Sequence, residues 1–487
     1  MAPSATASAI QLVPLTTDRA VVATHSAAAG AGSDHDEGAV HSASLAEREP
    51  STPGDIETGT PSSASSPALP LAGVDALPLV DGGPRAWAFL AAATTIEFMV
   101  WGLPFSVGVL NAYWSESLFP GQPQTVALAS TLPQGLLLFS GAVLAPLFTL
   151  LPWHEKRIQA VGMVIATVGL IASAFATKAW HLVVTFGCLY PFATALYFPC
   201  PIIVFEWFQA RRGLASGVVF AGTGAGGAAF PYIVTSLLGR FGYRTTMLAL
   251  GVAFISINSV ALTLIKRRVP LAARVSSSTR RPRPRTDFSF LAGRAAWAAF
   301  AFITISNLGS FIPLLWMPSY ATATHATRPD GTTLVAIMNG ITAPGFLLNG
   351  HLSDRLPARI VICTSCLLAT LSCLLLWGYG TSAGPLVAFA IVWGITAGST
   401  SGIWSKMVTV INKSGDPSVP AWTIATFACL KGVGSLTSGP ISNALLATGP
   451  LKGAGGAFGS TNYGSLFIYT AVTTFAGGLV AIAFPDK

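Results

Sequence analysis

Residues 334–379 read LVAIMNGITAPGFLLNGHLSDRLPARIVICTSCLLATLSCLLLWGY. The stretch begins and ends with apolar segments of about 20 residues, the length that a helix needs to cross a membrane. Between them lies a polar loop, Gly350-His351-Leu352-Ser353-Asp354-Arg355-Leu356-Pro357-Ala358-Arg359. We therefore predict two membrane helices that are joined by a short charged loop.

The chain after Asp81 repeats this alternation of apolar segments and loops. Only 9% of the residues are charged, against roughly 25% in a soluble globular protein, and the mean hydropathy is +0.61. This composition argues against a soluble fold, a nucleic-acid-binding protein and a secreted disulfide-rich protein, although the net charge is +8. We predict twelve membrane helices, at Trp87–Leu110, Thr125–Leu150, Ile158–Thr177, Leu182–Phe205, Leu214–Leu238, Thr246–Ile265, Ala295–Trp316, Leu334–Leu352, Ile360–Tyr379, Leu386–Val410, Trp422–Leu446 and Ser465–Phe484.

The predicted fold class is an all-α membrane protein with twelve transmembrane helices in two six-helix halves, the plan of secondary transporters with parallel halves. Residues 1–80 are rich in Ala, Ser, Thr, Pro and Gly and cannot bury a core, so we predict a disordered cytoplasmic tail. The other predicted divisions are an N-terminal half at 81–265, a basic cytoplasmic loop at 266–294 and a C-terminal half at 295–487.

The orientation in the membrane follows from the basic residues. Lys and Arg concentrate in the loops after even-numbered helices and beside the first and last helices, and such bases favour the cytoplasmic side. We therefore predict cytoplasmic termini, in the plasma membrane or, alternatively, in a vacuolar or other internal membrane. The loop at 266–294 holds nine bases and one acid, so it either attracts anionic lipid or serves only as an orientation signal.

The loop 350–359 has the pattern Gly-x-Leu-Ser-Asp-Arg-x-x-x-Arg, which resembles the signature loop of the major facilitator superfamily. Two further segments resemble helix entries of its monocarboxylate-porter branch, which has many fungal members: DGGPRAW at 81–87 and WFQARRGLASG at 207–217. The resemblance covers about residues 81 to 484. It implies a secondary transporter, a symporter or an antiporter, that binds a small solute between its two halves.

The resemblance also implies a gating role for these loops. A short Asp at a helix entrance can accept hydrogen bonds from free backbone N–H groups, and a neighbouring Arg can pair across to the other half. We expect Asp354 and Arg355 to form a latch on the cytoplasmic side. The residues expected in this gating region are Gly350, Asp354, Arg355, Arg359, Arg211 and Arg212.

The departures from the branch concern its transport site. In the animal proton-coupled monocarboxylate porters that this sequence resembles, a Lys lies late in helix 1. An Asp and an Arg lie one turn apart in helix 8 of those porters. The matching positions here hold Phe105, Asn339 and Ala343. The proton and carboxylate site of a lactate-type symporter is therefore absent.

Two charged residues remain deep inside the predicted helices. Glu97 lies ten residues into the first helix and Lys431 nine residues into the eleventh, so both lie roughly 15 Å from their helix starts. A mid-membrane charge is costly and usually faces a cavity or a partner. Glu97 is a candidate proton acceptor or substrate contact, and Lys431 a candidate anion contact or partner of Glu97; alternatively, both are structural. Weaker candidates for the substrate site are Asn307, Asn339, Tyr197 and Trp393.

We predict a secondary active transporter that moves a small organic solute, an organic acid or a secondary metabolite, with export as one direction. The alternative is a membrane receptor or scaffold with a transporter fold that moves nothing. An enzyme is not expected, because the sequence has no acid-base cluster at membrane depth and no P-loop. We expect the solute, protons and membrane lipid as partners, with no metal, cofactor or nucleic acid; substrate identity and oligomeric state stay open.

Overall fold

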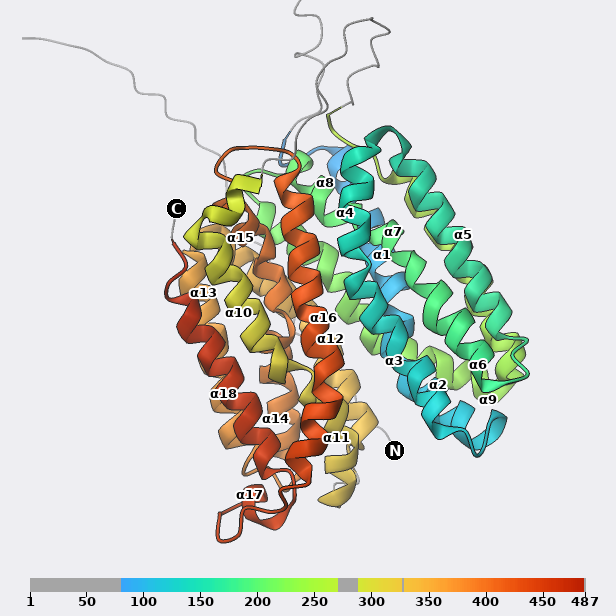
Figure 1. Ribbon diagram of the computed structural model, residues 1–487, viewed down its shortest axis with the longest axis vertical. Coiled ribbons are helices and arrows are strands. Elements are labelled where there is room, and N and C mark those ends of the chain that lie inside the picture. The colour runs from blue at the N-terminus through green and yellow to red at the C-terminus, as the bar shows by residue number, and fades with distance from the viewer. Residues whose placement is uncertain (1–79, 270–287, 326–327, 486–487) are drawn as a thin grey trace, which may run out of the picture. The chain divides into compact units, whose positions relative to one another are not determined.

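The computed structural model describes residues 80–269, 288–325 and 328–485 (Figure 1). The predicted tail up to residue 79 and residues 270–287 of the predicted basic loop lie outside this described part. Within the described residues, all regular elements are helices.

The chain up to residue 264 forms the first six membrane passes. Proline interrupts several of these passes because it removes a backbone donor; Pro104, for example, precedes the break at Ser106. The α-helices are α1 (Pro84–Phe105), α2 (Val107–Tyr113), α3 (Pro123–Phe139), α4 (Gly141–Leu150), α5 (Glu155–Ser173), α6 (Ala179–Leu182), α7 (Thr194–Tyr197), α8 (Pro199–Trp207) and α9 (Arg212–Leu264). Short π-helical or 3-10 turns lie at Trp114–Leu118, Pro152–His154, Val183–Leu189 and Tyr190–Ala193.

The chain from residue 288 forms the last six passes, which lie beside the first six (Figure 1). Its α-helices are α10 (Arg294–Ser310), α11 (Ile312–Ala323), α12 (Gly331–Arg355), α13 (Ala358–Leu371), α14 (Ala383–Trp393), α15 (Trp404–Ile411), α16 (Val419–Leu446), α17 (Ala457–Ser460) and α18 (Gly464–Ala481). Short π-helical or 3-10 turns lie at Phe288–Ala292, Ser372–Trp377, Gly394–Gly398 and Thr400–Ile403.

Eleven helical stretches of the described residues are long and apolar enough to cross a membrane. One of them is α9, whose 53 residues would extend about 80 Å as a single straight helix, far more than the roughly 30 Å of a hydrocarbon core. Gly242 breaks it with φ 72° and ψ 173°, a conformation that glycine adopts readily. Residues 212–241 and 243–264 therefore form two passes, and the predicted twelve-helix fold class is confirmed.

The helix limits agree with the predicted limits to within a few residues in most passes. The seventh pass ends at Ala323 rather than near Trp316, and the first pass runs from Pro84 to Leu118 rather than ending near Leu110. Polar residues such as Ser115 and Glu116 ended the predicted apolar run, but the chain stays helical there as α2 and a π-helical turn.

Twelve passes bring the start of α1 and the end of α18 to one side of the bundle. We call this side, at which α1 and α9 begin and α12 and α18 end, the terminal face; it is at the top of Figure 1. The opposite side, which holds α2, α17 and the break at Gly242, is the far face.

Two seams join the first six passes to the last six. In one, α9 packs against α12; in the other, α16 packs against α3 and α4. Gly217 of α9 lies so close to α12 that a Cβ atom there would collide with the carbonyl oxygen of Phe346. Small residues of this kind let two membrane helices approach closely.

Candidate functional site

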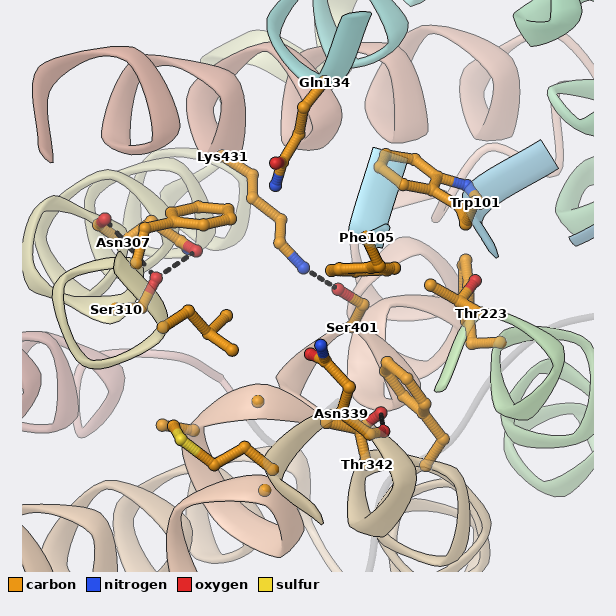
Figure 2. A pocket seen from close by; sticks show the side chains of 18 of the residues that line it. Trp101, Phe105, Gln134, Thr223, Asn307, Ser310, Asn339, Thr342, Ser401 and Lys431 are labelled. Atoms are coloured by element: carbon orange, nitrogen blue, oxygen red, sulfur yellow. Dashed lines mark hydrogen bonds between the residues drawn. The ribbon is translucent and has the colours of Figure 1, made fainter. Parts of the chain in front are cut away.

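A central cavity of about 970 Å³, including space open to solvent, lies between the two sets of passes (Figure 2). Its walls come from α1, α3, α7, α9, α10, α11, α12, α14, α15, α16 and the turns after α14. The polar residues that line it are Gln134, Thr223, Asn307, Ser310, Asn339, Thr342, Ser401 and Lys431. The aromatic residues that line it are Trp101, Phe105, Tyr197, Phe220, Phe311, Phe346, Trp393 and Trp404.

Lys431 of α16 points into this cavity, with its side chain partly buried (Figure 2). Its Nζ donates a hydrogen bond to Ser401 Oγ at 3.0 Å. The same ammonium lies 5.8 Å from the centroid of the Trp404 ring, within the range of a cation–π interaction. Lys431 thus remains a charged group that a solute in the cavity can reach.

Glu97 of α1 is fully buried and does not line the cavity. Its Oε2 accepts a hydrogen bond from Thr223 Oγ1 at 2.9 Å, and Thr223 does line the cavity. No described residue bonds the other oxygen, Oε1. No ion pair joins Glu97 and Lys431 within 4.0 Å in the described part of the chain. Thr223 therefore connects the acid to the cavity wall.

The four weaker candidates all line the cavity, but their polar groups differ in availability. Asn339 makes no side-chain hydrogen bond with a described residue, so its amide is free to meet a solute (Figure 2). Asn307 Nδ2 donates to the carbonyl of Ile303 at 2.8 Å, and its Oδ1 accepts from Ser310 at 3.0 Å.

The aromatic candidates contribute mainly their ring faces. The Tyr197 hydroxyl donates to the carbonyl of Leu137 at 3.0 Å, so it joins α7 to α3. Trp393 is buried, with its ring 5.5 Å from that of Phe389. The Tyr197 hydroxyl therefore forms an interhelical hydrogen bond, a common role for polar side chains in membrane helices.

Sequence reasoning missed five polar groups of the cavity: Gln134, Thr223, Ser310, Thr342 and Ser401. Gln134 gave a usable signal, because an uncharged amide in the middle of an apolar run of α3 is unusual. The other four gave none, since hydroxyl residues are common in membrane helices and bond their own backbone. Phe105 and Asn339, which stand where the branch has charged residues, do lie in the cavity wall.

The terminal face carries the second candidate region, where Asp354 connects α12 to α9. Its Oδ1 accepts from the backbone N–H of Gly213 at 2.7 Å, and its Oδ2 accepts from that of Leu214 at 2.8 Å. These N–H groups belong to the first turn of α9 and have no partner within the helix. A carboxylate of the last six passes thus satisfies a helix of the first six.

Asp81 binds the residues directly before this turn. Its carboxylate oxygens accept from the backbone N–H groups of Gln209 at 2.8 Å, Ala210 at 3.1 Å and Arg211 at 3.2 Å. Burial raises the pKa of this carboxyl, but the three donors outweigh burial and hold the pKa below its ordinary value. The three segments that each resemble the superfamily, at 81–87, 207–217 and 350–359, therefore contact one another at residues 209–214.

Arg212, not Arg355, makes the arginine contact between the two sets of passes. Arg212 Nη1 donates to Thr409 Oγ1 of α15 at 3.2 Å, and its guanidinium lies over the Phe205 ring. Arg355 is exposed, and no hydrogen bond or ion pair joins it to a described residue. The expected pairing of Arg355 across the halves is therefore not found among the described residues, where its side chain is exposed.

The other expected gating residues lie close by. Gly350 faces Gly213, and a Cβ atom on Gly350 would collide with the Gly213 carbonyl oxygen. Arg211 uses its backbone N–H to bond Asp81, while the side chains of Arg211 and Arg359 are exposed.

Comparison with known proteins adds to this geometry. The family model of the Major Facilitator Superfamily matches residues 90–416. The MFS-type transporter pynF of Aspergillus niger is 27% identical over 412 residues, which are 83% of this chain and 91% of that protein. The MFS transporter asaE of Aspergillus flavus is 24% identical, over 82% of this chain and 86% of that protein.

A yeast protein is similar as well. The probable transporter MCH2 of Saccharomyces cerevisiae is 25% identical over 347 residues, which are 68% of this chain and 69% of that protein. These relatives are transporters of fungi, as the sequence resemblance implied, and they indicate a transporter rather than an enzyme. The chain is an integral, multi-pass membrane transporter that belongs to the major facilitator superfamily.

Proposed function

We propose that this protein is a secondary active transporter that moves a small organic solute, an organic acid or a secondary metabolite, by alternating access. The observation that supports this most strongly is a cavity at mid-depth whose terminal side is closed by contacts between the two sets of passes. Such contacts must be able to break if the cavity is to open to that side.

The closure at the terminal face has two layers. In the described residues, the hydrogen bonds between nitrogen and oxygen that link the two sets of passes lie there, from Gly213 and Leu214 to Asp354 and from Arg212 to Thr409. Beneath them, the Phe220 ring contacts two rings of the other set, those of Phe346 at 5.8 Å and Trp404 at 6.0 Å.

The far face is joined differently. There, α2 packs against α1, α3 and α9 of its own set, and α11 packs against α10, α12 and α16 of its own set. This arrangement supports a state in which solute reaches the cavity from the far face. Because the terminal face carries most of the loop bases, we assign it to the cytosol, which makes this the outward-facing state of a plasma-membrane protein.

Glu97 and Lys431 are the groups that we propose to couple transport to a gradient. Glu97 can bind a proton behind Thr223, and Lys431 can bind an anionic group of the solute in the cavity. Because Thr223, which bonds Glu97, and Lys431 line the same cavity, we expect the occupation of one site to change the free energy of the other. The direction of net transport then follows the gradients.

The test begins with the solute. Untargeted metabolite comparison, inside and outside cells with and without the protein, identifies compounds whose distribution changes. The purified full chain in proteoliposomes should then show saturable flux of such a compound that depends on the pH difference across the membrane. Saturable binding without flux would instead support a receptor or scaffold with this fold.

A further inference from the structure

We infer that the solute is an organic anion with a planar conjugated ring system, rather than a short-chain carboxylate, a cation or a neutral compound. This inference rests on the proposed function and specifies its substrate class. Three properties of the cavity wall support it: its net charge, the placement of its free donors and its aromatic surface.

The charge of the wall selects anions. Lys431 is the one charged side chain among the described residues that line the cavity, and no Asp, Glu, Arg or His of the described chain accompanies it there. An ammonium has three donors, and one of them goes to Ser401. The other two remain for a ligand, and a ligand anion would offset the cost of a charge at this depth.

Uncharged donors accompany this charge from both sets of passes. Gln134 of α3 and Asn339 of α12 point into the cavity, and neither side chain hydrogen-bonds a described residue (Figure 2). A carboxylate has two oxygens and about four acceptor sites, so it can take bonds from an ammonium and an amide together. A ligand bound in this way would contact the first and the last six passes at once.

The remaining wall suits a flat ring. Trp101 and Phe105 come from α1, whereas Phe346, Trp393 and Trp404 come from the last six passes. Aromatic rings prefer offset-stacked or edge-to-face partners and gain free energy beyond simple burial. Because these rings come from both sets of passes, a flat ring can stack against both, whereas a short-chain carboxylate has no ring face to offer them.

Four matched probes separate these properties. Cinnamate has the ring and the charge, cinnamamide has the ring without the charge, cinnamylamine has the opposite charge, and acrylate has the charge without the ring. Titration calorimetry with the full chain in lipid nanodiscs should show cinnamate binding at least about tenfold more tightly than each of the other three, because hydrogen bonds to charged groups and ring stacking each contribute on that scale.

Substitutions then assign the preference to Lys431. Lys431→Met should reduce cinnamate binding to the level of cinnamamide, and Lys431→Arg should retain part of the difference. Lys452→Met is the matched control, because Lys452 is exposed on the far face, and it should bind cinnamate like the unmodified protein. Ser401→Ala, which removes the hydroxyl that holds the ammonium, should weaken cinnamate binding by about two- to fivefold and serves if Lys431→Met does not fold.

Three results would overturn the inference: equal affinity for cinnamate and cinnamamide, tighter binding of cinnamylamine than of cinnamate, or acrylate binding as tight as that of cinnamate. Flux separates this failure from a failure of the proposed function. If proteoliposomes transport another solute and cinnamate neither binds nor competes, the substrate class is wrong while the transporter stands. If cinnamate binds as expected and nothing is transported, the substrate class stands and the transport proposal fails.

Discussion

Two loops occupy equivalent places in the two sets of six passes, and they make opposite kinds of contact. In the loop 350–359, Asp354 accepts hydrogen bonds from α9, which belongs to the other set. In the loop 152–157, Glu155 pairs with Arg267 of its own set, with 2.7 Å between Oε2 and Nε. Arg267 also pairs with Glu206, at 2.8 Å.

The difference indicates which contacts are able to break during transport. An acidic cap on a helix contributes typically about 1 kcal/mol, which a cycle of opening and closing can overcome. Glu155, Glu206 and Arg267 all belong to the first set, and their ion pairs hold the chain that follows α9. Trp207 Nε1 also donates a hydrogen bond to the Lys266 carbonyl there, at 2.9 Å. We therefore expect contacts between the sets to change during transport and contacts within a set to persist.

The largest expected effect concerns Glu97 and Lys431, the two deep charged residues, which belong to opposite sets of passes. Glu97→Gln and Lys431→Met should each slow flux about tenfold or more, because each removes a charge that the proposed coupling requires, and a tenfold change corresponds to about 1.4 kcal/mol. The double variant should lose less than the sum of the two, measured as initial rates in proteoliposomes. Strict additivity, with unchanged pH dependence, would show that the two residues act independently.

The second effect compares the two seams between the sets. Gly217→Ala places a methyl group against the Phe346 carbonyl, whereas Gly141→Ala meets its nearest atom, in the Phe198 ring, at an ordinary 3.4 Å. Overpacking costs about 1 to 3 kcal/mol, so Gly217→Ala should lower the thermal unfolding temperature and open the terminal face. Gly141→Ala should change neither; equal effects at both seams would contradict the distinction.

The third effect compares the two acidic residues directly. Ser405 is buried one turn before Thr409 on α15, so a Ser405→Cys thiol reports opening of the terminal face. Asp354→Asn should raise the labelling rate of this thiol about fivefold, because the loss of a cap costs about 1 kcal/mol.

Glu155→Gln is the control for this measurement and should leave the labelling rate unchanged, because its partner Arg267 lies in the same set. The same labelling on protein without the Ser405 change corrects for the six native cysteines. A labelling rate raised equally by Glu155→Gln would remove the contrast between the two loops.

The smallest expected effect concerns Arg212. Thr409→Val removes its hydroxyl partner at an exposed position and should speed labelling of the Ser405→Cys thiol by about twofold or less. Thr364→Val, on the exposed side of α13, is the matched control, since its hydroxyl bonds only its own helix. An effect of Thr409→Val larger than that of Asp354→Asn would reverse the proposed order of the two contacts.

Much of the fold could be predicted from the sequence, because a membrane pass is specified by the length and hydropathy of a segment. The break between the fifth and sixth passes was also predictable, from the polar stretch around Arg240 and Arg244. What could not be predicted is rotation. α1 and α16 are apolar nearly all round, so no hydrophobic stripe tells which side faces the centre.

Because helix rotation could not be predicted, only part of the candidate site could be predicted from the sequence. Depth alone singled out Glu97 and Lys431, yet only the structure places Lys431 in the cavity wall and Glu97 behind Thr223. Likewise, the motif indicated a contact between the sets at Asp354, but whether Arg212 or Arg355 accompanies it depends on side-chain direction. Sequence spacing carries no information on such directions.

The central claim is that Asp354 holds the terminal face closed while the cavity is open to the far face. Pulsed electron resonance on the full chain in nanodiscs can measure this with two pairs of spin labels, at exposed positions of opposite sets: 210 with 413 on the terminal face, and 240 with 452 on the far face. We predict that Asp354→Asn adds a population with a longer 210–413 distance and a shorter 240–452 distance. Distributions that are unchanged, or that both lengthen, would contradict the claim.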